Sequence, residues 1–180
     1  MMTLKNGFFT NVTQVGSPHF NQRPINSEVS LLVIHNISLP PGKFGGGYVE
    51  DFFSGRLDHS IHPFFKQIAD VKVSAHLFIK RDGQIVQFVN CNERAWHAGI
   101  SEFEGRQNCN DYSIGIELEG TDDIKYTDEQ YTQLVQVSQQ IMMAYPNITP
   151  DRICAHSDIA PQRKTDPGPC FDWQRYRQNL

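Results

Sequence analysis

The segment from residue 153 to residue 169 constrains the fold most, because its three prolines and one glycine exclude a regular helix across it. We therefore expect a braced loop, and this loop carries His156, Lys164 and Asp166. His156 and Asp166 lie ten positions apart (166 − 156). A loop pinned by prolines can turn both side chains towards one point, while Lys164 faces the same cavity.

A metal ion held by His156 and Asp166 needs a further ligand, and His35 is the best candidate. His35 follows the apolar run 29–34, which predicts a buried central strand. Open α/β sheets bind their ligands beyond the carboxyl ends of the strands. Two histidines and one carboxylate form a three-ligand zinc set with an open fourth position, which is typical of catalytic zinc. Taken alone, His35 also fits a core histidine with a satisfied hydrogen bond.

Residues 111–120 alternate with the period of a strand, so that Glu117 shares one face with Gly115 and Glu119. A carboxylate inside an apolar strand is costly to bury unless it is hydrogen-bonded or near a cation. Glu117 is therefore a functional candidate, because a nearby metal ion would offset that cost. Gly115 leaves room for a ligand to approach the backbone. We expect Glu119, at the end of the strand, to be solvated.

Polar and aromatic side chains elsewhere are candidates for binding a substrate. Asn36 directly follows His35, where its amide would face a substrate or form a turn. Trp96 beside His97 suits a stacking wall for a sugar or a peptide, and a half-buried core tryptophan is an equally good interpretation. His76 lies on the less apolar face of a predicted strand, 73–80, where it lines a site or faces water.

The remaining pattern predicts one domain over residues 1–180 with a mixed α/β fold. Residues 1–28 indicate an irregular arm, and residues 40–66 a mobile loop region that contains a short helix over 48–53. His59 and His62 lie in that region, and we interpret them as solvated rather than as metal ligands. The dipeptide Asp82–Gly83 predicts a hairpin between strands 73–80 and 84–89. A capping box at Thr127 begins an amphipathic helix of about five turns that ends at Pro146, and residues 171–176 indicate a short closing helix.

Composition excludes several classes of function. A net charge of −4 argues against a protein that follows nucleic-acid phosphates. No stretch approaches the roughly 20 apolar residues of a membrane span, and residues 1–10 do not resemble a secretory signal. The four cysteines form no C-x-x-C pair, so we expect reduced thiols in the cytosol.

Taken together, the candidate residues indicate hydrolysis of an amide. Zinc lowers the pKa of a bound water to about 7 and polarises a carbonyl. Glu117 would accept the proton of that water and pass it to the departing amine. Lys164 would donate to the developing oxyanion, a role worth on the order of 3 kcal/mol for a well-placed donor.

Six stretches resemble the zinc N-acetylmuramoyl-L-alanine amidases of the peptidoglycan-recognition and phage-lysozyme type. They are LLVIHNISLPPG (31–42), VSAH (73–76), RAWHAG (94–99), SIGIELEG (113–120), HSDIAP (156–161) and RKTDPGP (163–169). They span nearly the whole chain after residue 28, and together they are very specific.

The resemblance implies that His35, His156 and Asp166 bind zinc and that Glu117 and Lys164 are catalytic. It also implies a mixed β-sheet flanked by helices. The chain is most similar to the cytoplasmic members that recycle peptidoglycan, so the substrate would be a 1,6-anhydromuropeptide cut between its lactyl group and L-alanine. No nucleic acid or membrane partner is implied, and the oligomeric state stays open.

The chain departs from its relatives near the residues that would bind the substrate. The candidates are Asn36, Lys72, Trp96, His97 and Arg106. Lys72 and Asn108 stand where close relatives have arginine, and lysine does not reproduce the two-pronged grip of arginine on a carboxylate. Two alternatives from other classes remain: a non-catalytic muropeptide-binding module of the same fold, and an amidase that acts on the intact cell wall.

Overall fold

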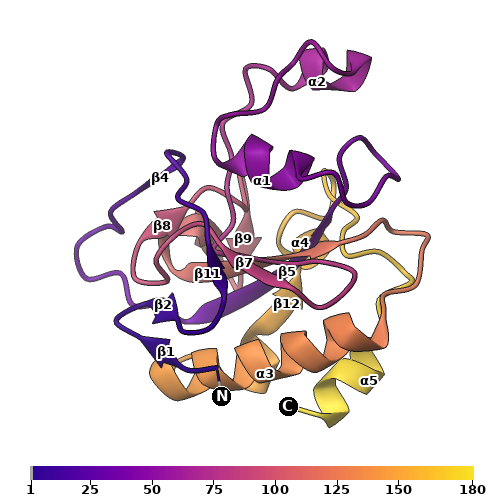
Figure 1. Ribbon diagram of the computed structural model, residues 1–180. Coiled ribbons are helices and arrows are strands. Elements are labelled where there is room, and N and C mark those ends of the chain that lie inside the picture. The colour runs from indigo at the N-terminus through magenta and orange to yellow at the C-terminus, as the bar shows by residue number, and fades with distance from the viewer. Residues whose placement is uncertain (1) are drawn as a thin grey trace.

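A computed structural model describes residues 2–180 and contains a mixed six-stranded sheet as its centre (Figure 1). The strands, in the order in which they lie side by side, are β12 (Ile153–Ala155), β5 (Leu31–Ile37), β11 (Ser113–Glu119), β6 (Leu77–Ile79), β7 (Ile85–Gln87) and β3 (Thr13–Gln14). The strands β12, β5, β11 and β6 run parallel to one another. The strand β7 runs antiparallel to β6, and β3 is parallel to β7. The predicted mixed sheet is confirmed.

The two central strands, β5 and β11, determine where the functional residues lie. Every residue of β11 is buried, as are the first five of β5, because both faces of the sheet are covered. Such strands are rich in branched apolar residues, which explains the runs of Leu, Val and Ile. Their parallel register pairs Glu117 with His35. The strand β5 extends two residues beyond His35, so this histidine lies within it and not after it.

Two helices cover one face of the sheet. Figure 1 shows α3 (Asp128–Ala144) running across that face with α5 (Trp173–Gln178) beside it. The capping box predicted at Thr127 is present, since its side chain accepts from Gln130 N and the Gln130 side chain accepts from Thr127 N. The apolar side of α3 packs on the sheet, and Ser138 bonds Tyr176 of α5 at 2.6 Å. The helix prediction from Thr127 to Pro146 is confirmed.

The opposite side carries a smaller helical segment. The helix α1 (Tyr48–Phe53) has the predicted bounds, and α2 (Pro63–Gln67) follows it and stands furthest from the sheet in Figure 1. Phe53 of α1 and Phe65 of α2 are buried in an apolar cluster that also includes Phe78 and Val86 of the sheet. His62 caps α2 through its ring, and His59 Nδ1 lies 3.0 Å from the Phe65 carbonyl.

The N-terminal arm is more regular than expected. Strands β1 (Leu4–Lys5) and β2 (Phe8–Phe9) form a hairpin, β3 joins the main sheet, and β4 (Phe20–Asn21) pairs with β8 (Arg94–Ala95). The hairpin turn is Asn6–Gly7, with φ of 49° and 79°. Asn-Gly is the preferred sequence for a two-residue turn with positive φ at both positions, so the signal was present in the sequence.

The other short elements connect this framework. They are β9 (Glu102–Phe103), β10 (Arg106–Gln107), the 3-10 turns Cys109–Asp111 and Pro150–Arg152, and the single helical turn α4 (His156–Ile159). All four cysteines are free, as expected. Within residues 2–180, no helix combines the length and the apolar character that crossing a membrane requires.

Candidate metal centre

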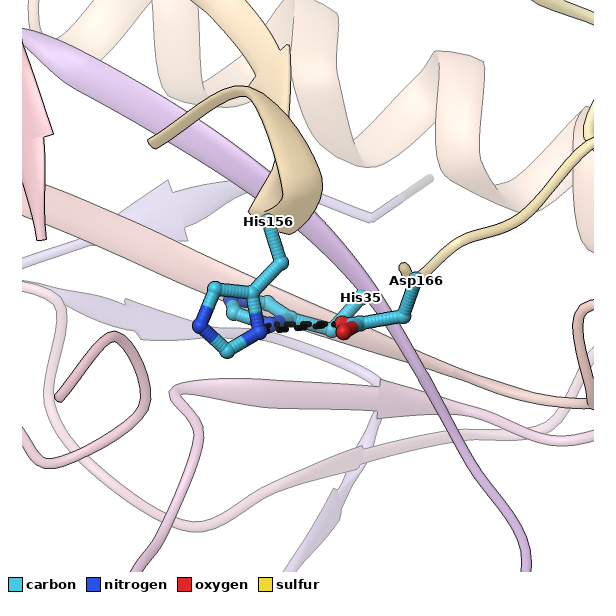
Figure 2. A group of neighbouring side chains, drawn as sticks. All are labelled: His35, His156 and Asp166. Atoms are coloured by element: carbon cyan, nitrogen blue, oxygen red, sulfur yellow. Dashed lines mark hydrogen bonds and ion pairs between the residues drawn. The ribbon is translucent and has the colours of Figure 1, made fainter. Parts of the chain in front are cut away.

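Three side chains from distant parts of the chain converge on one point, as Figure 2 shows. His35 Nδ1 and His156 Nδ1 lie 2.9 Å apart. Asp166 Oδ2 lies 3.2 Å from His35 Nδ1 and 3.0 Å from His156 Nδ1. Both histidines are almost fully buried, and 13% of the Asp166 side chain is exposed. The structure therefore brings together the three residues that the sequence suggested as metal ligands.

Strand pairing accounts for the position of the two histidines. Parallel strands end at the same edge of a sheet, and β12 pairs with β5 so that Ala155 lies opposite Ile34. His35 is the next residue of β5, and His156 directly follows the end of β12. The chain then turns once in α4, which differs from the helix-free loop that we expected, and Asp158 caps this turn by accepting from Ala155 N at 2.8 Å.

The rest of the loop brings the carboxylate back to the histidines. Ser157 N donates to the Asp166 carbonyl at 3.1 Å, which fixes the end of the loop against its beginning. Lys164 N donates to the Ala160 carbonyl at 2.9 Å and keeps the intervening residues in a compact turn. A proline-rich loop thus reaches the geometry predicted for it.

The donor set fits a zinc ion. Zinc binds histidine nitrogen at about 2.0–2.1 Å in tetrahedral sites, so that two ligands of one ion lie roughly 3.3 Å apart. The three separations of 2.9, 3.0 and 3.2 Å are close to this value. Two imidazole nitrogens that point lone pairs at one carboxylate oxygen repel each other unless a cation lies among them. Neither His59 nor His62 belongs to this group.

Burial and hydrogen bonding set the charges at the site. Burial lowers the pKa of His35 to about 4, although the nearby Asp166 carboxylate acts in the opposite direction. Burial alone would raise the pKa of Asp166, but its close contacts with the His156 and His35 rings outweigh this effect and lower that pKa. His35 therefore favours the neutral form and Asp166 the anionic form, which are the forms that bind metals.

A cavity of about 650 Å³ opens over this cluster and has two unlike walls. Polar residues form the wall at the sheet: Asn36, Glu117, Asp122, His156, Lys164 and Asp166. Apolar residues from α1, α2 and the following segment form the facing wall: Phe52, Phe64, Ile68, Val71 and Val73. Sequence reasoning did not find this second wall, because its residues are spread from the predicted helix 48–53 to the start of the predicted strand 73–80 and share no local pattern.

Glu117 is the one carboxylate that lines the cavity, among the described residues, with a buried oxygen that has no partner. Its exposure is 9%, and its Oε2 makes no hydrogen bond. Burial raises the pKa of Glu117 well above its usual value, the Asp166 carboxylate adds to this effect, and Lys164 opposes it. A buried carboxyl group with a raised pKa that opens into a cavity suits proton transfer.

Two expectations about neighbouring residues are wrong. Glu119 is 4% exposed and not solvated, because period-two alternation places it on the same covered face as Glu117. Its carboxylate accepts from Gly45 N and from Arg81 N, at 3.0 Å in the second case, and so fastens the glycine-rich loop to the sheet. His76 neither faces water nor lines the cavity: it is fully buried, and its Nδ1 accepts from Gly115 N at 3.0 Å.

The candidate substrate-binding residues divide into two groups. Asn36 and His97 line the cavity, and the Asn36 amide donates to Asp122 Oδ1 at 2.8 Å. Lys72, Trp96 and Arg106 are not among the residues that line it. The Trp96 indole donates to Asn21 Oδ1 at 2.7 Å, and the Arg106 guanidinium lies over the Tyr112 ring. A role in substrate binding stays a prediction for all five.

Comparison with known proteins gives consistent results. The family model described as N-acetylmuramoyl-L-alanine amidase matches residues 25–169. The chain is 56% identical over 177 residues to 1,6-anhydro-N-acetylmuramyl-L-alanine amidase AmpD of Haemophilus influenzae, which covers 98% of this chain and 96% of the relative.

Two solved structures extend this comparison. A crystal structure of a selenomethionine derivative of AmpD matches with a TM-score of 0.97 and 52% identity, over 99% of both chains. The amidase AmiD from Escherichia coli, in complex with the substrate anhydro-N-acetylmuramic acid-L-Ala-D-γ-Glu-L-Lys, matches with a TM-score of 0.62 and 30% identity. That match covers 99% of this chain and 65% of the AmiD chain.

Proposed function

This chain belongs to the N-acetylmuramoyl-L-alanine amidase family, and we propose that it is a zinc enzyme that acts on 1,6-anhydromuropeptides. The bond cut joins the lactyl group of 1,6-anhydro-N-acetylmuramic acid to L-alanine of the stem peptide. The proposal includes the substrate named for the AmpD relative and the ligand named for the AmiD complex. Residues 1–180 act as a single amidase domain.

One observation carries the proposal. Glu117 lines the same cavity as His156 and Asp166 of the candidate metal centre, and its Oε2 is buried without a hydrogen-bond partner. A binding module has no need of a buried carboxyl group with a raised pKa, because burial of such a group without a partner is costly. The arrangement therefore favours hydrolysis over binding alone.

His35, His156 and Asp166 would hold zinc, and the three ligands suit a site that keeps an open position. When bound, zinc supplies Lewis acidity, which lowers the pKa of water and polarises a carbonyl. The residues around it perform the remaining tasks. Asp166 provides the negative charge of the ligand set, and the imidazoles of His35 and His156 complete it.

Glu117 and Lys164 carry the proton transfer and the charge stabilisation. Glu117 accepts a proton from the attacking water, and its raised pKa lets it return that proton to the leaving amine of L-alanine. Lys164, which lines the same cavity, donates to the oxygen of the scissile carbonyl as negative charge develops there. The Asn36 amide is held by Asp122, which leaves its oxygen to accept from an N–H of the substrate.

The two walls of the cavity suit the two parts of a muropeptide. A stem peptide carries amides and carboxylates, which need polar partners such as Asn36 and Lys164. The anhydro sugar has a rigid bicyclic ring with apolar faces, and the wall formed by Phe64, Ile68 and Val71 offers apolar contact. Burial of such faces contributes to affinity in proportion to their area.

We place the reaction in the cytoplasm, where it would serve peptidoglycan recycling. Four free thiols are typical of a reducing compartment, because disulfides are rare there. Fractionation of cells that express a tagged chain tests this location, and recovery of the protein outside the cytoplasm contradicts it.

Metal analysis combined with mass spectrometry of a digested anhydromuropeptide tests the function. We expect one zinc per chain and two products, anhydro-N-acetylmuramic acid and a free stem peptide. Glu117→Ala should retain zinc and lose turnover. Retained turnover in this variant removes Glu117 from the mechanism, and binding of the muropeptide without any product supports a binding module instead.

A second substrate distinguishes an enzyme of peptidoglycan recycling from an enzyme that acts on the intact cell wall. We expect soluble anhydromuropeptides to be cut and intact sacculi to resist cleavage under the same conditions. Faster release of stem peptides from sacculi would identify an enzyme of the intact cell wall.

A further inference from the structure

One short segment, residues 97–98, contacts both histidines of the metal centre. His97 Nδ1 lies 2.9 Å from His35 Nε2, and the Ala98 carbonyl oxygen lies 3.1 Å from His156 Nε2. His35 and His156 belong to different elements, 121 positions apart. Two consecutive residues therefore contact, in both histidines, the ring nitrogen that faces away from the cluster.

These contacts determine which nitrogen of each ring keeps its lone pair. A carbonyl oxygen only accepts, so His156 Nε2 carries the proton and His156 Nδ1 presents a lone pair to the cluster. The same arrangement follows at His35 when Nε2–H donates to His97 Nδ1. His97 Nε2–H then donates to Ser113 Oγ at 3.1 Å. With this assignment, the N–H group of His35 and that of His97 each have an acceptor.

The side chain of Asn110 holds this segment in place. Its Oδ1 accepts from His97 N at 3.0 Å and from Ala98 N at 2.8 Å. Asn110 is 7% exposed, and its own carbonyl accepts from the buried guanidinium of Arg23 at 3.0 Å. The carboxamide oxygen of Asn110 therefore fixes the orientation of the two consecutive peptide groups that contain His97 N and Ala98 N.

The surrounding packing leaves the segment little freedom to move. A Cβ added to Gly115 would lie 2.5 Å from the His97 ring, so this ring packs directly on the bare backbone of β11. Arg163 donates to the Ala98 carbonyl at 2.7 Å from the other side. Asn110 is the residue that holds the backbone of both His97 and Ala98, and through it the positions of the His97 ring and the Ala98 carbonyl.

We propose that Asn110 is a positioning residue for the metal centre, which orients His35 through His97 and His156 through Ala98. The proposal rests on the zinc site of the proposed function. Groups that orient metal ligands in this way typically change metal affinity by about 10- to 100-fold when they are removed. Asn110 touches neither the cluster nor the cavity, so its effect reaches the metal only through these two neighbours.

The test compares zinc affinity in two variants that each lose a buried carboxamide. Asn110→Leu keeps a side chain of similar size and removes the oxygen that accepts from residues 97 and 98. Gln87→Leu is the matched control, because Gln87 is 1% exposed and its Oε1 accepts from Phe9 N at 2.8 Å, in the N-terminal arm. Competition with a chromophoric zinc chelator gives the dissociation constant, and thermal unfolding of the metal-free proteins gives stability.

We expect Asn110→Leu to weaken zinc binding about 10- to 100-fold, and Gln87→Leu to lower the unfolding temperature with zinc affinity unchanged. The absorption spectrum of the cobalt-substituted protein should also change in Asn110→Leu alone. Asn110→Asp retains an acceptor oxygen and should recover most of the affinity. Unchanged zinc affinity in Asn110→Leu overturns the proposal, and so does an equal loss in Gln87→Leu.

A milder variant covers the case in which Asn110→Leu does not fold. Ser113→Ala removes the acceptor of His97 Nε2–H and leaves the backbone of residues 97–98 in place. We expect a smaller loss of zinc affinity, on the order of 10-fold, and no loss at all overturns the proposal. Failure of the proposed function gives a different result, because the unsubstituted chain would then bind no zinc or release no product.

Discussion

The two walls of the cavity are built by different forces. At the sheet, His35 and His156 are almost fully buried, and each ring is oriented by a hydrogen bond at Nε2, to His97 Nδ1 and to the Ala98 carbonyl respectively. On the facing wall, Phe64 and Ile68 are only partly buried and Val71 is 43% exposed, and these side chains contribute apolar surface without direction. In Figure 1, α2 stands away from the sheet whose strand β5 carries His35.

This contrast teaches which task each wall performs. Hydrogen bonds are directional and fix atoms to within tenths of an ångström, which catalysis needs. Apolar contact is non-directional and tolerates adjustment, which suits the recognition of a bulky substrate. Substitutions at the sheet should therefore change chemistry, and substitutions on the facing wall should change binding.

The largest effect is expected for His35→Ala. Loss of one of three ligands should remove zinc and lower turnover by about a thousandfold or more, because Lewis-acid stabilisation is worth several kcal/mol. Metal analysis and product release measure both. His59→Ala is the matched control, since His59 lies outside the cluster and should retain zinc. A zinc-replete and active His35→Ala enzyme would contradict the assignment.

Lys164→Met should lower kcat by roughly 100- to 1,000-fold and retain zinc, because the donor to the developing oxyanion is lost while the apolar stem remains. Steady-state kinetics with an anhydromuropeptide measure this effect. Lys66→Met, on the exposed side of α2, should have wild-type kinetics. An increase in KM without a change in kcat would show that Lys164 only binds the ground state.

Phe64→Ala tests the apolar wall. We expect KM to rise roughly tenfold, since loss of apolar contact with the substrate costs on the order of 1.4 kcal/mol, and kcat to stay unchanged. Ile61→Ala is the control, because Ile61 is 56% exposed and does not line the cavity. A fall in kcat at constant KM would mean that this wall takes part in the chemistry and that the contrast between the walls is wrong.

The smallest effect concerns stability. Because burial raises the pKa of Glu117 in the folded state, the metal-free protein binds its proton more tightly than the unfolded chain does. Its stability should therefore fall as pH rises above about 4.5, by at most about 1.4 kcal/mol per pH unit. Glu117→Gln mimics the protonated form and should be more stable than the unsubstituted protein at pH 7, with the difference vanishing near pH 4. Urea unfolding across this range measures it, and a variant that is less stable at pH 7 would contradict the sign.

Local signals in the sequence were sufficient for most elements. The capping box at Thr127, the apolar run before His35 and the bounds 48–53 all agree with the structure. The spacing within the proline-rich loop also indicated that His156 and Asp166 converge, as they do. These features depend on residues within a few turns of each other or on one strand, where propensity and periodicity act directly.

Long-range packing decided what the sequence left open. Glu119 and His76 are buried because segments distant in sequence pack over them. No local pattern around either residue predicts this burial. Whether a side chain lines the cavity depended on the path of distant loops, which left Trp96 bonded to Asn21 and outside it.

The sequence by itself determined which residues are chemically able to bind a metal and move a proton, because residue type and local spacing fix those properties. Only the tertiary structure decided that residues 97–98 and Asn110 stand behind both histidines. This support consists of hydrogen bonds between segments that are remote in sequence, and such bonds exist only once the order and register of the strands are set.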